Sequence, residues 1–149
     1  MEDIIKSSNL KSYVGNGNDL NYIVNTINKI RKDNGLEELV SNYNLNTSAR
    51  EKAEDMVNRD YWSHADPDGN MAWNLIKNAG YNYQKAGENL AKDYDNIGAI
   101  EAWLASPSHL ENILSPYFSD IGYGNYGNIK VNHFGKKQSF WDNVRKLLA

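Results

Sequence analysis

The sequence contains no cysteine, so the chain can form neither disulfide bonds nor thiolate metal sites. This absence excludes zinc fingers, cysteine proteases and cysteine-ligated deaminases. No apolar run approaches the roughly 20 residues of a membrane-spanning helix, so we expect no transmembrane segment, and the first residues lack a signal-peptide pattern. The 19 acidic residues outnumber the 16 basic ones, and no long basic run occurs. Because phosphate binding needs clustered Lys and Arg, we expect no nucleic-acid partner.

The length of 149 residues, with 10 Tyr and 4 Trp for packing, fits one domain with a substantial core. We expect a monomer whose domain spans residues 19–136. Residues 1–18 close in the turn-rich run Gly15-Asn16-Gly17-Asn18 and are predicted to be a tail or linker. Residues 137–149 are predicted to be a C-terminal tail, in which the apolar spacing favours a short helix.

The spacing of apolar residues changes along the chain from helical to alternating. Three- and four-residue spacing predicts helices at 19–34, about 45–60, 71–79 and 97–104, and a short helical turn after Ser106. The first of these is capped by Asp19 and stopped by Asn34-Gly35. Apolar runs and alternation predict one short strand at 88–91 and a hairpin of 118–123 and 129–134. This order predicts an α+β domain in which helices cover a small antiparallel sheet.

Three polar residues, His64, Glu88 and His109, are the candidate site residues. Each is expected where a helix, strand or turn begins or ends, and two histidines with a carboxylate suit a metal site or a general acid/base site. A carboxylate rarely enters a buried strand without a partner, and the two histidines are the most economical partners for Glu88. Capping of backbone groups at a strand edge is the alternative for Glu88.

The position of His109 predicts its protonation state. If Ser106 caps the short helix, His109 is the third helical residue, where the helix dipole disfavours the imidazolium. We therefore expect a neutral His109, as a metal ligand or a general base requires. Two alternatives remain open: a capping box from Ser108 to Glu111 would move the helix start, and His109 would otherwise only hydrogen-bond in a partly buried corner.

The remaining polar motifs have structural interpretations. The stretch from Asp66 to Asn70 has the alternate oxygens of a calcium loop, but Pro67 interrupts it and the later Glu is missing, so we interpret it as a turn. His133 alternates with apolar residues in the last strand, which indicates a sheet histidine with satisfied hydrogen bonds. No metalloprotease, serine hydrolase or phosphate-binding motif occurs.

Several motifs resemble, in order and spacing, those of the CAP superfamily in its bacterial SCP-like branch. They are Tyr61-Trp62-Ser63-His64, Gly87-Glu88-Asn89-Leu90-Ala91, Trp103 with Ser106-Pro107-Ser108-His109, Asn112-Ile113-Leu114 and Ile121-Gly122-Tyr123-Gly124. The resemblance covers about residues 20–135. Ordered motifs of this kind are far more specific than any one of them alone.

The resemblance implies an α-β-α sandwich, usually exported, with a surface cleft lined by two histidines and two acidic residues. His64, Glu88 and His109 fall on three of these positions, and Ser106 replaces the fourth, an acidic residue. Glu101 lies roughly 200° around the same helix from that position and is a poor substitute. The resemblance therefore implies zinc or another divalent ion held by His64 and His109, with a reduced set of ligands.

Three functions are compatible with this resemblance, and the sequence favours binding over catalysis. In the first, an extracellular or cell-surface module binds a protein or a small ligand in the cleft. In the second, His64 and His109 hold zinc, and Glu88 activates water for hydrolysis. In the third, the chain carries a lipid or sterol. A purely structural role for Glu88, tying the two histidines together, is the remaining interpretation of the site.

Overall fold

A four-stranded sheet lies at the centre of the structure, a computed structural model that describes residues 21–149. The strands lie in the order β1-β3-β4-β2, with bounds Val40–Ser41 for β1, Tyr83–Lys92 for β2, Asp120–Tyr126 for β3 and Ile129–Lys137 for β4. The helices are α2 (Tyr22–Asp33), α3 (Tyr43–Asn58), α4 (Trp73–Asn78), α5 (Asn96–Leu104), α6 (Pro107–Ile113) and α7 (Phe140–Leu148). The predicted tail 1–18 and the Asp19 cap lie outside the described residues.

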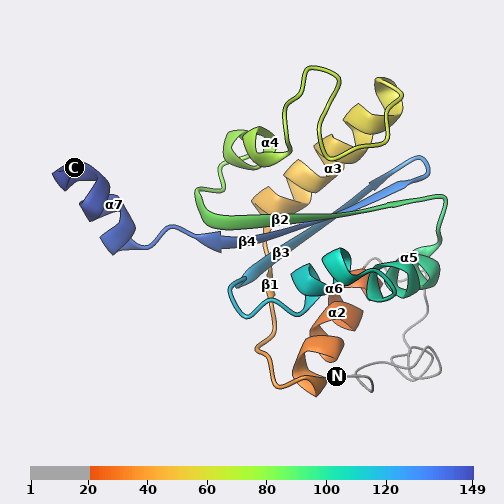
Figure 1. The fold of residues 1–149 in the computed structure, drawn as a ribbon, viewed down its shortest axis with the longest axis horizontal. Coiled ribbons are helices and arrows are strands. Elements are labelled where there is room, and N and C mark those ends of the chain that lie inside the picture. Colours follow the sequence, from red (N-terminus) through yellow and green to blue (C-terminus); the bar gives the residue numbers. More distant parts are fainter. Residues whose placement is uncertain (1–20) are drawn as a thin grey trace.

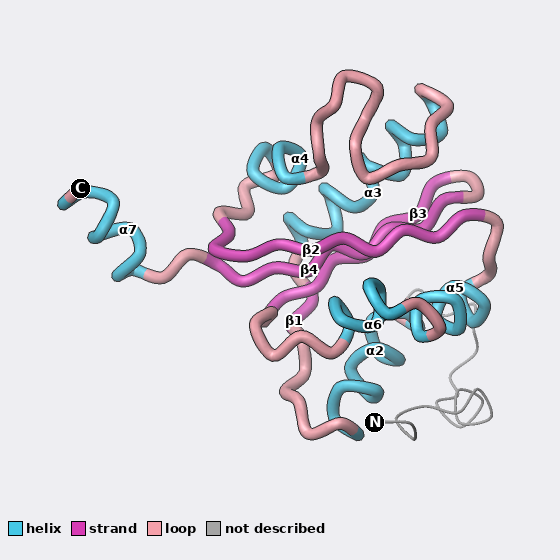
Figure 2. The backbone as a smooth tube through the Cα atoms, in the orientation of Figure 1, coloured by secondary structure: helices cyan, strands magenta, loops and turns pink. Residues whose placement is uncertain are grey.

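Helices cover both faces of the sheet, which confirms the predicted α+β sandwich. Figure 1 shows α3 and α4 on one face and α2, α5 and α6 on the other. The predicted C-terminal helix is also present as α7, and Figure 2 shows it apart from both helical layers. The first long helix ends as predicted, because Gly35 adopts a φ of 73° that favours glycine.

The sheet is mixed, whereas the sequence predicts an antiparallel one. The two residues of β1 pair in parallel with β3, Val40 opposite Asp120 and Ser41 opposite Ile121. The sequence pattern predicts only a connector there, because two residues are too few to show an alternation. The other strands form the predicted hairpin, β3 to β4, and an antiparallel pair, β2 to β4.

Strand β2 is longer than predicted and forms an edge of the sheet. It pairs with β4 along its length, with Glu88 opposite His133 and Asn89 opposite Asn132. Successive side chains of a strand point to opposite faces. The side chains of Glu88 and His133 therefore lie on the face of the sheet that α3 covers, while the side chain of Asn89 lies on the face that α6 covers. Polar side chains thus line both faces of the sheet at this edge.

Close packing of α3 on β3 depends on two glycines of β3. A Cβ atom at Gly122 would lie 2.1 Å from the carbonyl carbon of Leu45, and one at Gly124 would lie 2.2 Å from the amide nitrogen of Arg50. Any side chain at either position would push α3 away from the sheet. This contact keeps Ser48 of α3 within hydrogen-bonding distance of β4.

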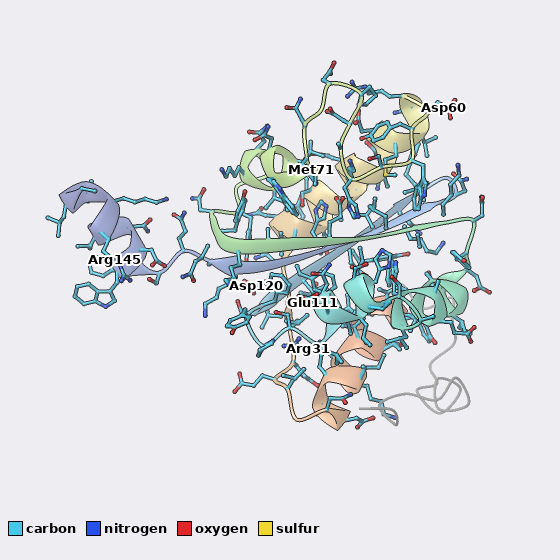
Figure 3. All side chains as sticks on the ribbon, in the orientation of Figure 1. Arg31, Asp60, Met71, Glu111, Asp120 and Arg145 are labelled. Atoms are coloured by element: carbon cyan, nitrogen blue, oxygen red, sulfur yellow. The ribbon has the colours of Figure 1, made fainter. Side chains whose placement is uncertain are left out.

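On the other face, a buried arginine fixes the end of α6. Arg31 of α2, labelled in Figure 3, is 2% exposed. Its guanidinium donates to the carbonyl oxygens of Ile113 at 2.9 Å, Ser115 at 2.7 Å and Glu37 at 2.9 Å. The bonds to Ile113 and Ser115 satisfy carbonyl groups at the end of α6, the helix that carries His109. They therefore help to position the site.

Candidate functional site

The carboxylate of Glu88 is the buried centre of the site. Its Oε1 accepts a hydrogen bond from Nδ1 of His64 and its Oε2 accepts one from Nε2 of His133, both at 2.7 Å. Burial alone would raise the pKa of Glu88, but the hydrogen bonds from His133 and His64 outweigh it and hold the pKa below its ordinary value. Glu88 is therefore ionised at neutral pH and acts as an acceptor for both rings.

One predicted partner of Glu88 is confirmed and the other is wrong. The sequence pattern predicts His64 and His109 as partners of Glu88. In the structure the partners are His64 and His133. His133 is fully buried, and its Nδ1 lies 2.7 Å from the hydroxyl oxygen of Ser48. The predicted satisfied sheet histidine is thus confirmed, but its contact with Glu88 depends on the strand register, which the sequence pattern does not specify.

His64 is oriented by Glu88 and remains open to solvent. Its side chain is 47% exposed, and within residues 21–149 its Nε2 makes no hydrogen bond. A carboxylate on Nδ1–H fixes the tautomer and leaves a lone pair on Nε2. This nitrogen is available to accept a proton, a hydrogen bond or a coordinate bond.

The loop that carries His64 is held by a buried lysine and a tight turn. Lys52 of α3 is 1% exposed and donates to the carbonyl oxygen of His64 at 2.8 Å and to the hydroxyl oxygen of Tyr61 at 3.2 Å. The predicted turn follows, with the carboxylate of Asp66 accepting from the amides of Asp68 and Asn70 at 2.9 Å. These backbone contacts confirm the interpretation of this stretch as a turn.

His109 is the third residue of α6, with Ser106 at the N-cap position, as predicted. The pKa of His109 is lowered by burial and then by the nearby charge of His64. The predicted neutral imidazole agrees with this direction, and burial is the largest cause. Among the described residues, Nδ1 of His109 is one of two buried side-chain atoms that lack a hydrogen-bond partner.

Two asparagines join α6 to the edge strand. The side-chain amide of Asn89 donates to the carbonyl oxygen of His109 at 3.1 Å. Asn112 donates to the side-chain oxygen of Asn89 at 2.9 Å and to the carbonyl oxygen of Glu88 at 3.2 Å. Neither residue was predicted to belong to the site, although Asn89 follows Glu88 directly and Asn112 begins the motif Asn112-Ile113-Leu114. They set the position of His109 relative to Glu88.

A cavity of about 400 Å³ lies beside His109. Its lining combines aromatic and apolar side chains with a few polar ones, among them Trp62, Leu90, Tyr94, Trp103, Ser106 and His109. Ser106 thus lies at the cavity next to His109, where the resemblance expects it, and its hydroxyl is 3.4 Å from that of Ser108. Cavities of this size and composition accept small ligands.

A family model described as the cysteine-rich secretory protein family, CAP, matches residues 24–134. The chain belongs to this family. Residues 24–134 lie within the predicted domain, and the family's name contrasts with the absence of cysteine here. None of the helices among residues 21–149 is long and apolar enough to span a membrane.

The CAP chain is similar to two curated proteins of Bacillus subtilis over 103 residues, which is 68% of its length. It is 36% identical to the uncharacterized protein YkwD and 30% identical to the uncharacterized membrane protein YlbC. It spans 40% of the length of the first and 30% of the second. The shared region is therefore a minor part of both relatives.

Two solved structures that the chain resembles come from bacteria. An extracellular protein of Bacillus anthracis with an SCP domain has a TM-score of 0.77 and 28% identity, over 89% of this chain and 44% of that one. An outer surface protein of Borrelia burgdorferi has a TM-score of 0.74 and 25% identity, over 84% of this chain and 97% of that one.

The donor set of this CAP cleft is smaller than that of a typical protein zinc site. Zinc sites in proteins use three or four protein ligands. Within residues 21–149, no three His, Cys, Asp or Glu side chains are grouped so that they could hold an ion. Glu88 uses both oxygens for histidines, and a serine stands at the fourth position. His64 and His109 remain as two imidazoles, one or two ligands short of a typical zinc site.

Proposed function

We propose that this CAP domain is an exported binding module whose cleft takes up a small ligand between His64 and His109. The observation that carries the proposal is the cavity beside His109, whose buried Nδ1 has no hydrogen-bond partner among residues 21–149. A buried polar atom without a partner is costly unless a ligand or water satisfies it. The extracellular and outer-surface locations of the two structural neighbours support export.

The lining of the cavity indicates the chemical class of the ligand. Trp62 and Tyr94, each 48% exposed, offer aromatic surface for an apolar or aromatic body. A neutral His109 in the lining offers one N–H and one lone pair, and the half-exposed ring of His64 lies outside the lining with its Nδ1 on Glu88. The proposed ligand is therefore a small amphipathic molecule with a hydrogen-bonding head group, a class that includes short-chain lipids.

Nuclear magnetic resonance tests this proposal with octanoate and indole-3-acetate as probes. We expect either probe to shift the imidazole resonances of His64 and His109, and a Trp62→Ala variant to weaken that effect about tenfold through loss of aromatic burial. Tyr117→Ala is the matched control, because Tyr117 is an exposed aromatic residue outside the cavity. Shifts that map elsewhere, or equal weakening by both variants, contradict the proposal.

Hydrolysis is a second candidate, favoured by the 2.7 Å hydrogen bond between Glu88 and His64. A carboxylate that orients a histidine leaves its other nitrogen as a general base. The role assigned to Glu88 then differs from activation of water, because both of its oxygens are occupied and shielded from solvent. In this candidate function Nε2 of His64 takes the proton of a water molecule, and Glu88 stabilises the imidazolium.

The Glu88→Gln variant separates the two functions. The hydrolase candidate predicts that turnover of casein or p-nitrophenyl acetate falls at least 100-fold in this variant. If the domain is a binding module, we expect no turnover that depends on Glu88. The affinity of the variant for octanoate should then change only if the cavity itself is disturbed. Glu101→Gln, an exposed substitution on α5, is the control for the loss of one negative charge.

The divalent ion implied by the family resemblance stays a separate proposal. Two imidazoles, from His64 and His109, would hold zinc weakly, with water or substrate as the other ligands. Calorimetry with zinc at pH 7.5 tests it: binding that His64→Ala and His109→Ala both abolish supports a bridging ion. Binding unchanged in His109→Ala contradicts it.

A further inference from the structure

Helix α7 presents large apolar side chains to solvent. Phe140 is 71% exposed, Trp141 66%, Leu147 86% and Leu148 82%, and no residue of the helix is buried. Figure 1 shows α7 beyond the end of β4, away from the sheet and from both helical layers. Scattered exposed apolar residues are ordinary, but a contiguous group on one short element indicates an interaction surface.

The local sequence encodes both the helix and its amphipathic character. Ser139 caps the helix by accepting from the amide of Asp142 at 3.1 Å, and Asp142 accepts from the amide of Ser139 at 2.8 Å. At about 100° per residue, Phe140, Trp141, Val144, Leu147 and Leu148 fall within an arc of about 120°. This apolar stripe is wide enough to face an apolar phase.

Basic side chains occur in the same segment as the apolar stripe, with Arg145 beside it and Lys146 on the opposite side of α7. Residues 136–149 contain Lys136, Lys137, Arg145 and Lys146 with a single acidic residue, Asp142, a local charge of +3 in a chain whose net charge is −3. Arg145 projects from α7 in Figure 3 and lies 3.2 Å from the carboxylate of Asp142. The positive charge extends into the sheet, because Lys85 of β2 lies opposite Lys136.

We propose that α7 docks on an anionic lipid surface, with its apolar stripe among the lipid head groups and acyl chains and its basic residues on the phosphates. A short amphipathic helix with Trp, Phe and Leu on one face and Lys or Arg beside them has the composition of an interfacial helix. Anionic lipid attracts a polybasic segment, so the charges and the stripe favour the same partner. A second copy of the chain fits less well, because pairing of two α7 helices would bring two segments of charge +3 together.

Vesicle sedimentation of the full chain tests the proposal. We expect binding to vesicles containing phosphatidylglycerol, and binding at least tenfold weaker to vesicles of phosphatidylcholine alone. Trp141 reports insertion, because brominated acyl chains quench a tryptophan that enters the head-group region. The quenching should disappear in Trp141→Phe, since the other three Trp residues lie in the body of the domain.

Two variants and their matched controls separate the apolar and electrostatic contributions. The double variant Leu147→Glu with Leu148→Glu should weaken binding at least tenfold. Its control is the double variant Val40→Glu with Tyr43→Glu, which adds the same charge at exposed apolar positions elsewhere and should not weaken binding. Lys136→Gln with Lys146→Gln should also weaken binding about tenfold. Lys32→Gln with Lys92→Gln is its control, because both lysines are exposed and lie outside the basic segment.

Three results would overturn the proposal. Absence of binding to phosphatidylglycerol vesicles removes it directly. Equal loss in a variant and its control shows that overall charge, rather than α7, governs binding. A vesicle-independent dimer in sedimentation equilibrium that Leu147→Glu with Leu148→Glu dissociates assigns the apolar stripe to self-association. Every substituted residue is exposed, so the variants should remain folded.

Discussion

Glu88 and His133 face each other across the β2–β4 pair, and Nε2 of His133 donates to the Glu88 carboxylate at 2.7 Å. Both side chains are almost fully excluded from solvent, and Glu88 also accepts from His64 at the surface. A buried carboxylate thus connects the core of the sheet to the exposed cleft. Stability and site geometry therefore depend on the same residue.

Replacement of Glu88 by Ala should lower the free energy of unfolding by about 3 kcal/mol, because it leaves His133 buried without its acceptor. Urea denaturation at pH 7 measures the change. Glu101→Ala is the control, as Glu101 is exposed on α5, and its effect should stay within about 0.5 kcal/mol. Similar effects of the two substitutions would contradict the central role of Glu88.

The stabilising contribution of Glu88 should depend on pH in one direction. Its pKa in the folded chain lies below the ordinary value of 4.5, because the hydrogen bonds from His133 and His64 outweigh burial. The contribution is therefore complete above about pH 4.5 and is lost as the pH falls through the folded pKa. Urea midpoints of the native chain and Glu88→Gln should converge as the pH falls below about 4.5. A constant difference would show that the carboxylate charge contributes nothing.

His109 should titrate below its ordinary pKa of 6.5, because burial and then the charge of His64 disfavour its protonation. The unfolded chain takes up this proton first, so His109 should lower stability as the pH falls below about 6.5 and have no such effect above it. Imidazole resonances measure the pKa. His64→Ala should raise it part of the way, since burial remains, and no change would exclude a charge effect between the two rings.

Replacement of Lys52 by Met should loosen the loop that carries His64, while it keeps a buried unbranched side chain of similar length. The ammonium donates to the carbonyl oxygen of His64 at 2.8 Å, and such a charged hydrogen bond contributes about 1.5 kcal/mol. Hydrogen exchange of residues 61–66 should therefore accelerate about tenfold. Lys32→Met, at an exposed position, is the control. Unchanged exchange in Lys52→Met would mean that the turn after His64 holds the loop alone.

The local pattern of the sequence is sufficient for much of the fold. The long helices, the hairpin and the turn from Asp66 to Asn70 were predicted within a few residues, because periodicity and turn chemistry are local properties. The prediction failed at β1, where two residues pair with a distant strand. It also left β2 without a partner, since pairing is a property of the sheet.

The sequence by itself indicated His64, Glu88 and His109 as candidate site residues and a neutral state for His109. The tertiary structure decided which residues meet: the register of β2 on β4 places His133 on Glu88, and the position of α6 leaves Nδ1 of His109 buried without a partner among the described residues. A one-residue shift of register would turn Glu88 to the opposite face of the sheet. Register and helix docking depend on packing between distant segments, and no local pattern contains that information.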